Sequence, residues 1–128
     1  MASILKVDQL QGIAAAKTVT VTVGASATQS LEQGLAKVWS HYSQTDNTVR
    51  DSFNLSSVTD TSAGLHTYVF SNNMSNANWA AGFIGRNNRH QWNTDEGATT
   101  GRAVRTADAN NGAGDQHSNT LICVGDLA

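Results

Sequence analysis

The side chains that could act as metal ligands or as acids and bases lie far apart along this chain. The four histidines, His41, His66, His90 and His117, occupy separate segments. No two of them have the close spacing of a zinc site on one helix or hairpin. Each is therefore expected to be a partly exposed strand or loop residue, although symmetry in an oligomer could bring copies of one histidine together around an axis.

The carboxylates and hydroxyls show no catalytic pattern either. Asp95 and Glu96 are the only adjacent pair with catalytic potential; such neighbours point to opposite faces on a strand and are solvated in a loop. The segment DANNGAGD, residues 108–115, lacks the alternating acidic ligands and the closing glutamate of a calcium loop, so a flexible turn is expected. No serine lies in a G-x-S-x-G turn, and no phosphate-binding loop is present. We therefore predict a protein that is not an enzyme and has no metal or cofactor.

Cys123 is the only cysteine, which excludes an intramolecular disulfide. Its neighbours Leu121, Ile122 and Val124 are apolar. Since free cysteine behaves as a small apolar residue, this pattern predicts a buried thiol in a strand near the end of the chain.

One polar segment could serve recognition rather than catalysis. The segment GRNNRHQWN, residues 85–93, groups Arg86, Arg89, His90 and Trp92 with four asparagine or glutamine side chains. Aromatic and amide groups on loops suit sugars or polar surfaces, and Trp and Arg are favoured anchors in protein interfaces. These four residues are the candidates for outward recognition. The alternative is that Trp92 closes the end of the fold while the arginines face water.

The elements that would position these residues are short β-strands. Alternating apolar and polar residues predict strands in the following segments: 17–25, 35–42, 53–58, 65–70, 79–84 and 120–127. The polar stretch 59–64 joins two of them into a hairpin, Ser30 or Thr28 could cap a helical turn at Leu31, and residues 85–106 are expected to form long loops with one or two short strands. Seven to nine short strands predict an all-β fold, an antiparallel β-sandwich of jelly-roll-like type with an extended N-terminal arm.

The chain is expected to divide into an N-terminal docking arm, residues 1–16, and a β-sandwich head, residues 17–128. Residues 3–10 alternate loosely and could be a strand or an extended arm. Four apolar residues of this arm are candidates for docking onto a larger particle: Ile4, Leu5, Val7 and Leu10. The beginning of the sequence does not have the pattern of a secretory signal, and no apolar run reaches the ~20 residues that cross a bilayer.

Composition indicates a polar surface with few charges. Only 14% of the residues are charged, compared with roughly 25% in typical soluble domains, and the formal net charge is −2. This balance gives no general attraction to nucleic acid or anionic membranes. The chain has no proline, and proline and charge are the usual means of blunting exposed strand edges. We therefore expect neighbouring subunits to cover the edges.

Three phrases carry a resemblance to a known family. They are LKVDQLQG near the start, LEQGLAKVWSHY at residues 31–42, and VRDSFNLSSVTDTSAGLHTYVFSNNMSNANW at residues 49–79. Together they resemble small structural proteins and fibre-tip domains of tailed bacteriophages, especially of phages that infect marine bacteria. The matching residues are Gln33 to Trp39, Asp51 to Asp60, Gly64, Phe70 and Met74. The region after Gly85 matches no pattern of this family.

The resemblance implies a non-enzymatic virion component, made in the cytoplasm of the host bacterium. It would be a homotrimer in which the arm docks on other virion proteins of the capsid or tail, and the fibre or knob-like head contacts a host surface glycan or protein. An alternative is a capsid decoration (cement) protein that clamps neighbouring capsomers. A soluble carbohydrate-binding lectin is a third interpretation, and a β-sandwich hydrolase would need two carboxylates facing one groove. No nucleic-acid partner and no membrane insertion are expected.

Overall fold

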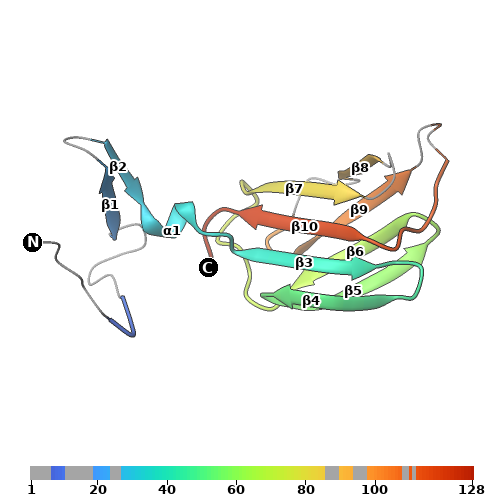
Figure 1. Ribbon diagram of the computed structural model, residues 1–128, viewed down its shortest axis with the longest axis horizontal. Coiled ribbons are helices and arrows are strands. Elements are labelled where there is room, and N and C mark those ends of the chain that lie inside the picture. The colour runs from blue at the N-terminus through green and yellow to red at the C-terminus, as the bar shows by residue number, and fades with distance from the viewer. Residues whose placement is uncertain are drawn as a thin grey trace, which may run out of the picture. The chain divides into compact units, whose positions relative to one another are not determined.

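The computed structural model describes residues 7–10, 19–23, 27–85, 90–93, 98–107, 110 and 112–128 (Figure 1). The chain divides into two compact units, Met1–Leu35 and Ala36–Ala128. The sequence placed this division after residue 16. The structure instead assigns residues 17–35 to the N-terminal unit.

The N-terminal unit contains a two-stranded antiparallel hairpin. Strand β1 (Thr20–Val23) pairs with β2 (Ala27–Ser30), and a single helical turn, α1 (Leu31–Gly34), follows directly. This turn lies where the capping residues predicted it. Val21 on β1 is exposed. A two-stranded sheet by itself offers no second layer that could bury one of its faces.

Eight strands of the second unit form two four-stranded antiparallel sheets (Figure 1). The first sheet has the order β4 (Thr48–Phe53), β3 (Val38–Ser43), β10 (Asn119–Val124), β7 (Ala80–Gly85). The second has the order β5 (Leu55–Ser62), β6 (Leu65–Phe70), β9 (Gly101–Ala107), β8 (His90–Asn93). The two sheets enclose one core, which confirms the predicted all-β antiparallel sandwich.

The core is built from the inward positions of these strands. Its buried apolar residues come from both sheets and from the loop between β6 and β7: Val38, Tyr42, Tyr68, Phe70, Met74, Trp79, Val104, Leu121 and Cys123. Burying one large apolar side chain of this kind contributes roughly 1.5–3 kcal/mol. The free thiol of Cys123 is fully buried in β10, as the sequence predicted.

A single residue carries the chain from one sheet to the other. Asn54, with φ 55°, separates β4 from β5, so the strand predicted over residues 53–58 is wrong: Phe53 belongs to the first sheet and Leu55 to the second. The Asn54 Nδ2 atom donates to the carbonyl oxygens of Lys37 and Asn72, and its Oδ1 atom accepts from the Asn72 backbone. These bonds fix the corner, since asparagine tolerates a positive φ and bonds locally to backbone.

The predicted hairpin is present as β5 and β6, and Gly64 lies in its turn. Gly64 has φ 70° and donates from its backbone nitrogen to Asp115 Oδ1 at 2.8 Å. A Cβ atom at this position would lie 2.5 Å from the Thr106 carbonyl oxygen. The turn therefore requires glycine for both its dihedral angle and its close approach to β9.

The described residues of the range 85–106 form two strands after β7, within the expected one or two, but one of them is central. Strand β9 lies between β6 and β8 and is buried at most of its positions. One inward residue is Arg102, whose guanidinium carbon lies 4.1 Å from the centroid of a Trp79 ring. A cation stacked on an aromatic face is stabilised when water is excluded, so a charged residue can occupy this position.

Candidate assembly surface

Two of the four docking residues can be placed in the N-terminal unit. Val7 and Leu10 are exposed by 56% and 59%, while Ile4 and Leu5 lie outside the described residues. The side chains of Val7 and Leu10 are thus exposed on the N-terminal unit, where a partner protein could contact them. Their docking role stays a prediction.

The recognition candidates are described in part. Arg86 and Arg89 lie outside the described residues, and so do the side chains of His90 and Trp92. The backbone of His90 and Trp92 belongs to β8, where they pair with Ala107 and Arg105 of β9. The structure therefore assigns these two residues to a strand at the end of the second sheet rather than to a loop.

The outer face of the β4-β3-β10-β7 sheet carries an unusual number of exposed apolar side chains. Inward positions of this sheet belong to Val38, Tyr42, Leu121 and Cys123, so alternation places the intervening residues on the outer face. Five large apolar side chains lie there, with these exposed fractions: Trp39 37%, Phe53 52%, Ile84 68%, Ile122 46% and Val124 40%. We call these five residues, together with Ala80 and Gly82, the outer apolar face.

Strand pairing shows that this face is continuous. Phe53, Trp39, Ile122 and Gly82 are consecutive partners across the four strands. Val124 pairs with Ala80, and Ile84 pairs with Thr120, each one step along the same face. Monomeric proteins rarely expose contiguous apolar patches larger than a few hundred Å². The face therefore has the character of a surface that another protein covers.

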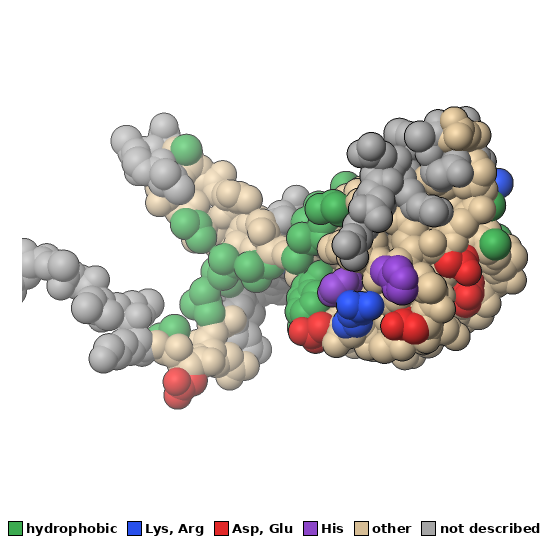
Figure 2. Space-filling view, turned by 45° about the vertical axis from the view of Figure 1, so that its right-hand side comes forward, with side chains coloured by type: hydrophobic (Ala, Val, Ile, Leu, Met, Phe, Trp, Pro, Cys, Tyr) green, Lys and Arg blue, Asp and Glu red, His purple; other side chains and the backbone are tan. Residues whose placement is uncertain are grey.

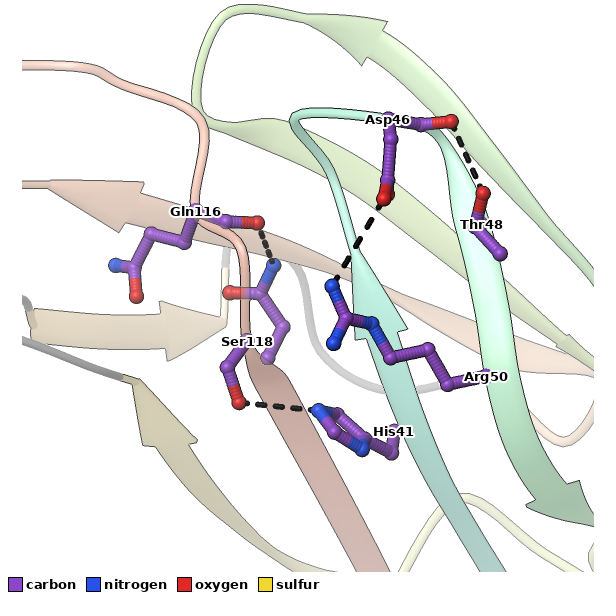
Figure 3. Close-up of polar contacts among 7 residues, drawn as sticks. His41, Asp46, Thr48, Arg50, Gln116 and Ser118 are labelled. Atoms are coloured by element: carbon purple, nitrogen blue, oxygen red, sulfur yellow. Dashed lines mark hydrogen bonds and ion pairs between the residues drawn. The ribbon is translucent and has the colours of Figure 1, made fainter.

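Polar residues border the outer apolar face at the next row of the sheet. His41 pairs with Asp51, and its Nε2 atom lies 3.1 Å from Ser118 Oγ (Figure 3). At the bulge in β4, Arg50 lies 3.8 Å from an oxygen of Asp46. Figure 2 shows hydrophobic side chains of the sandwich beside a group of histidine, basic and acidic side chains. An apolar centre with a polar rim is the usual anatomy of a protein interface.

Figure 3 also shows how the loop ends at this rim are fixed. Thr48 Oγ1 donates to the Asp46 carbonyl oxygen at 3.1 Å, and Asn119 Nδ2 donates to the Gln116 carbonyl oxygen at 3.3 Å. The side chain of Ser43 is the largest cause that lowers the pKa of Asp46, and the charge of Arg50 lowers it further. These contacts hold the two loops beside the sheet in place.

His66 corrects the expectation of a partly exposed histidine, because its side chain is fully buried. Its ring packs against those of Tyr42 and Tyr68, at centroid distances of 5.2 and 5.0 Å, and its Nε2 atom lies 3.2 Å from Tyr68 Oη. Burial lowers the pKa of His66 to about 4, although the charges of Asp60 and Asp115 oppose the shift. A neutral histidine inside a wall of tyrosines is a core residue rather than an exposed acid or base.

Tyr42, Tyr68 and the thiol of Cys123 are held in their neutral forms within the core. Burial is the main cause that raises the pKa of Tyr42 to about 12 and that of Cys123 to about 12, and it also raises the pKa of Tyr68. Nucleophilic chemistry needs the thiolate, so Cys123 is an inert structural residue.

The described part of the chain contains no group of three or more histidine, cysteine or acidic side chains that could hold a metal ion. Among the same residues, no helix has the length and apolar character needed to span a membrane. Comparisons with protein-family models, with curated proteins and with solved structures gave no match to this chain. The outer apolar face is therefore the feature from which function must be inferred.

Sequence reasoning missed this face, although one signal was present. In β10 the apolar run Leu121, Ile122, Cys123 and Val124 does not alternate with polar residues. A strand without alternation is typical of burial on both sides. The run therefore indicated that the outer side of this sheet is apolar as well as its core side.

Proposed function

We propose that this protein is a non-enzymatic structural component of a bacteriophage virion, a trimeric fibre or knob-like surface protein. Its sandwich head contacts neighbouring subunits and is displayed toward the host surface. Its N-terminal residues attach it to other virion proteins. The observation that carries the proposal is the outer apolar face, because such a surface in water favours a protein whose working state is an assembly.

Two further features support an assembly role. The strands of the sandwich contain no proline, and Val7 and Leu10 are exposed in the N-terminal unit. The family resemblance of residues 31–79 supplies the phage assignment. Exposed apolar residues near the start of the chain suit a docking element that gains free energy when it is covered.

A capsid decoration protein is the alternative, and the exposure of Val7 and Leu10 favours it equally. In that role the clamp on the shell is the function, and the head need bind no host molecule. Replacing both residues with serine is then expected to weaken heat resistance of the particle without changing adsorption. A fibre protein with the same changes is expected to lose adsorption, since heads detached from the particle cannot hold a host.

The first experiment is light scattering on the full chain and on a version that lacks residues 1–12. We expect a trimer in both cases, because the sandwich supplies the subunit contact. A monomer that binds glycans would replace the virion proposal with that of a soluble lectin. Antibodies against the sandwich are expected to label phage particles banded from an infected-cell lysate, and particles that stay unlabelled would overturn the virion assignment.

A further inference from the structure

We propose that a second copy of this chain covers the outer apolar face, with Trp39 and Phe53 of one copy packed on Ala80 and Gly82 of the next. The inference rests on the proposed function, because it names the partner of the same surface. It commits to contact between copies through this sheet rather than through strand edges or through the N-terminal unit.

The size of the face fits a subunit contact. From the exposed fractions of its five large side chains, the face exposes roughly 450 Å² of apolar surface, within the range of about 300–600 Å² for the largest patch on a monomer, which is often functional. A stable interface takes about 800 Å² from each partner, of which somewhat more than half is apolar. The outer apolar face with its polar rim therefore has about the area that one partner gives to a standard interface, and in a ring this area is divided between two neighbours.

The shape of the face suits a copy of itself. The β4 and β3 half carries the two aromatic side chains, Phe53 and Trp39, whereas the β7 half carries Ala80, Gly82 and the exposed Ile84. A Cβ atom at Gly82 would lie 3.3 Å from Ile122 Cγ2, so the isoleucine side chain lies against the glycine. One half thus projects two large rings, and the other offers a low apolar surface at Ala80 and Gly82 beside Ile84. Large anchors packed on small residues are typical of well-packed interface centres.

The distribution of charge agrees with this contact. Within the outer apolar face no residue is charged, and the charged residues Asp51 and Arg50 lie on β4 outside the row of Trp39. Charged residues are depleted at interface centres because burying an unpaired charge is costly. The rim residues can remain in water when two copies pack through the apolar row.

The contact joins the aromatic half of the face on one copy to the β7 half of the face on the next copy, so it is heterologous. A heterologous contact closes into a ring when the rotation between copies permits it. In the proposed trimer each copy would give its aromatic half to one neighbour and its β7 half to the other. The outer apolar faces would then surround the axis of the ring.

Disulfide trapping tests the contact directly, in a full chain carrying Phe53→Cys and Ala80→Cys. Within one chain these positions are separated by three strand spacings, roughly 14 Å, which is beyond the reach of a disulfide. Native Cys123 is fully buried and does not compete. Mild oxidation is expected to give covalent trimers on a non-reducing gel. Products that end at the covalent dimer would overturn the ring, and the absence of any covalent product would overturn the contact.

A matched pair on the other sheet provides the control. Thr59→Cys and Ala103→Cys lie on the outer side of the β5-β6-β9-β8 sheet, two strand spacings apart. This variant is expected to stay monomeric on the same gel. Covalent trimers from it would place the subunit contact on the wrong sheet and would overturn the inference.

A charge substitution gives a second measurement that does not depend on oxidation. Phe53→Arg is expected to weaken association by about a hundredfold in sedimentation equilibrium, whereas Thr59→Arg leaves it unchanged. Phe53 is half exposed in one copy, so the circular dichroism of the dissociated variant is expected to match that of the parent. A Phe53→Arg protein that associates as tightly as the parent would refute the contact. The labelling of particles decides the proposed function independently of this result.

Discussion

Acid is expected to destabilise the sandwich through His66, which is buried in its neutral form against Tyr42 and Tyr68. Its pKa falls from 6.5 to about 4 on folding, so below pH 6.5 the unfolded chain binds a proton that the folded chain does not. The free energy of unfolding must therefore decrease as the pH falls from about 6.5 toward 4. At 1.36 kcal/mol per unit the full loss is about 3 kcal/mol, of which about 2 kcal/mol is reached by pH 5.

Urea unfolding at a fixed protein concentration, measured between pH 7.5 and 4.5, checks this prediction. The His66→Gln variant carries no titrating group at this position, so its stability is expected to vary less with pH than that of the parent. The control is His117→Gln, whose exposed side chain makes little contact with the core and whose unfolding should follow the parent. If the difference between parent and His66→Gln changes by less than about 0.5 kcal/mol over this range, histidine burial is not the cause.

Three further predictions concern the backbone corner, the hairpin turn and the thiol. Gly64→Ala is expected to lower the free energy of unfolding by at least about 2 kcal/mol in urea titrations. The reason is that φ is positive at this position and the Thr106 carbonyl oxygen occupies the space of the new methyl group. Gly64→Ala with unchanged stability would contradict the described turn. Asn54→Gly keeps the positive φ but loses the donor to Lys37, so a smaller loss of about 1–2 kcal/mol is expected, and Asn54→Ala should lose more in the same titration. Cys123 is expected to react with a thiol reagent at pH 8 at least about a hundredfold more slowly in the folded than in the unfolded protein, and rapid labelling of folded protein would show that β10 is open.

The sequence was sufficient to predict the sandwich and the hairpin, because alternation over Leu65–Phe70 and the polar turn before it are local signals. The buried side of that strand could not be chosen in advance. Leu65 and Val69 are more apolar than His66 and Tyr68, yet His66 and Tyr68 face the core. Only the pairing with β9 and the opposing Tyr42 decide this orientation, and both are long-range contacts.

The candidate surface was harder to predict than the fold. The predicted contacts were a loop and an arm, because exposed polar or aromatic clusters stand out in a linear sequence. The outer apolar face instead combines residues from four strands. Phe53 on β4 and Ile84 on β7 belong to one face only because β3 and β10 fill the space between their strands in the folded sheet. Similarly, the central position of β9 could not be predicted, because Arg102 and Thr106 are polar residues typical of loops, although both are buried.

The position of β10 has a consequence for the order of folding. This strand fills the centre of its sheet, and it pairs on one side with β3, which lies about eighty residues earlier in the chain. While the ribosome is still making the segment before Asn119, β3 and β7 have no common partner, and each presents an open edge. The first sheet can therefore close only after translation has passed Val124. Such distant pairing slows folding. It exposes the nascent chain to pairing with its neighbours on a polysome before it reaches its own final strand.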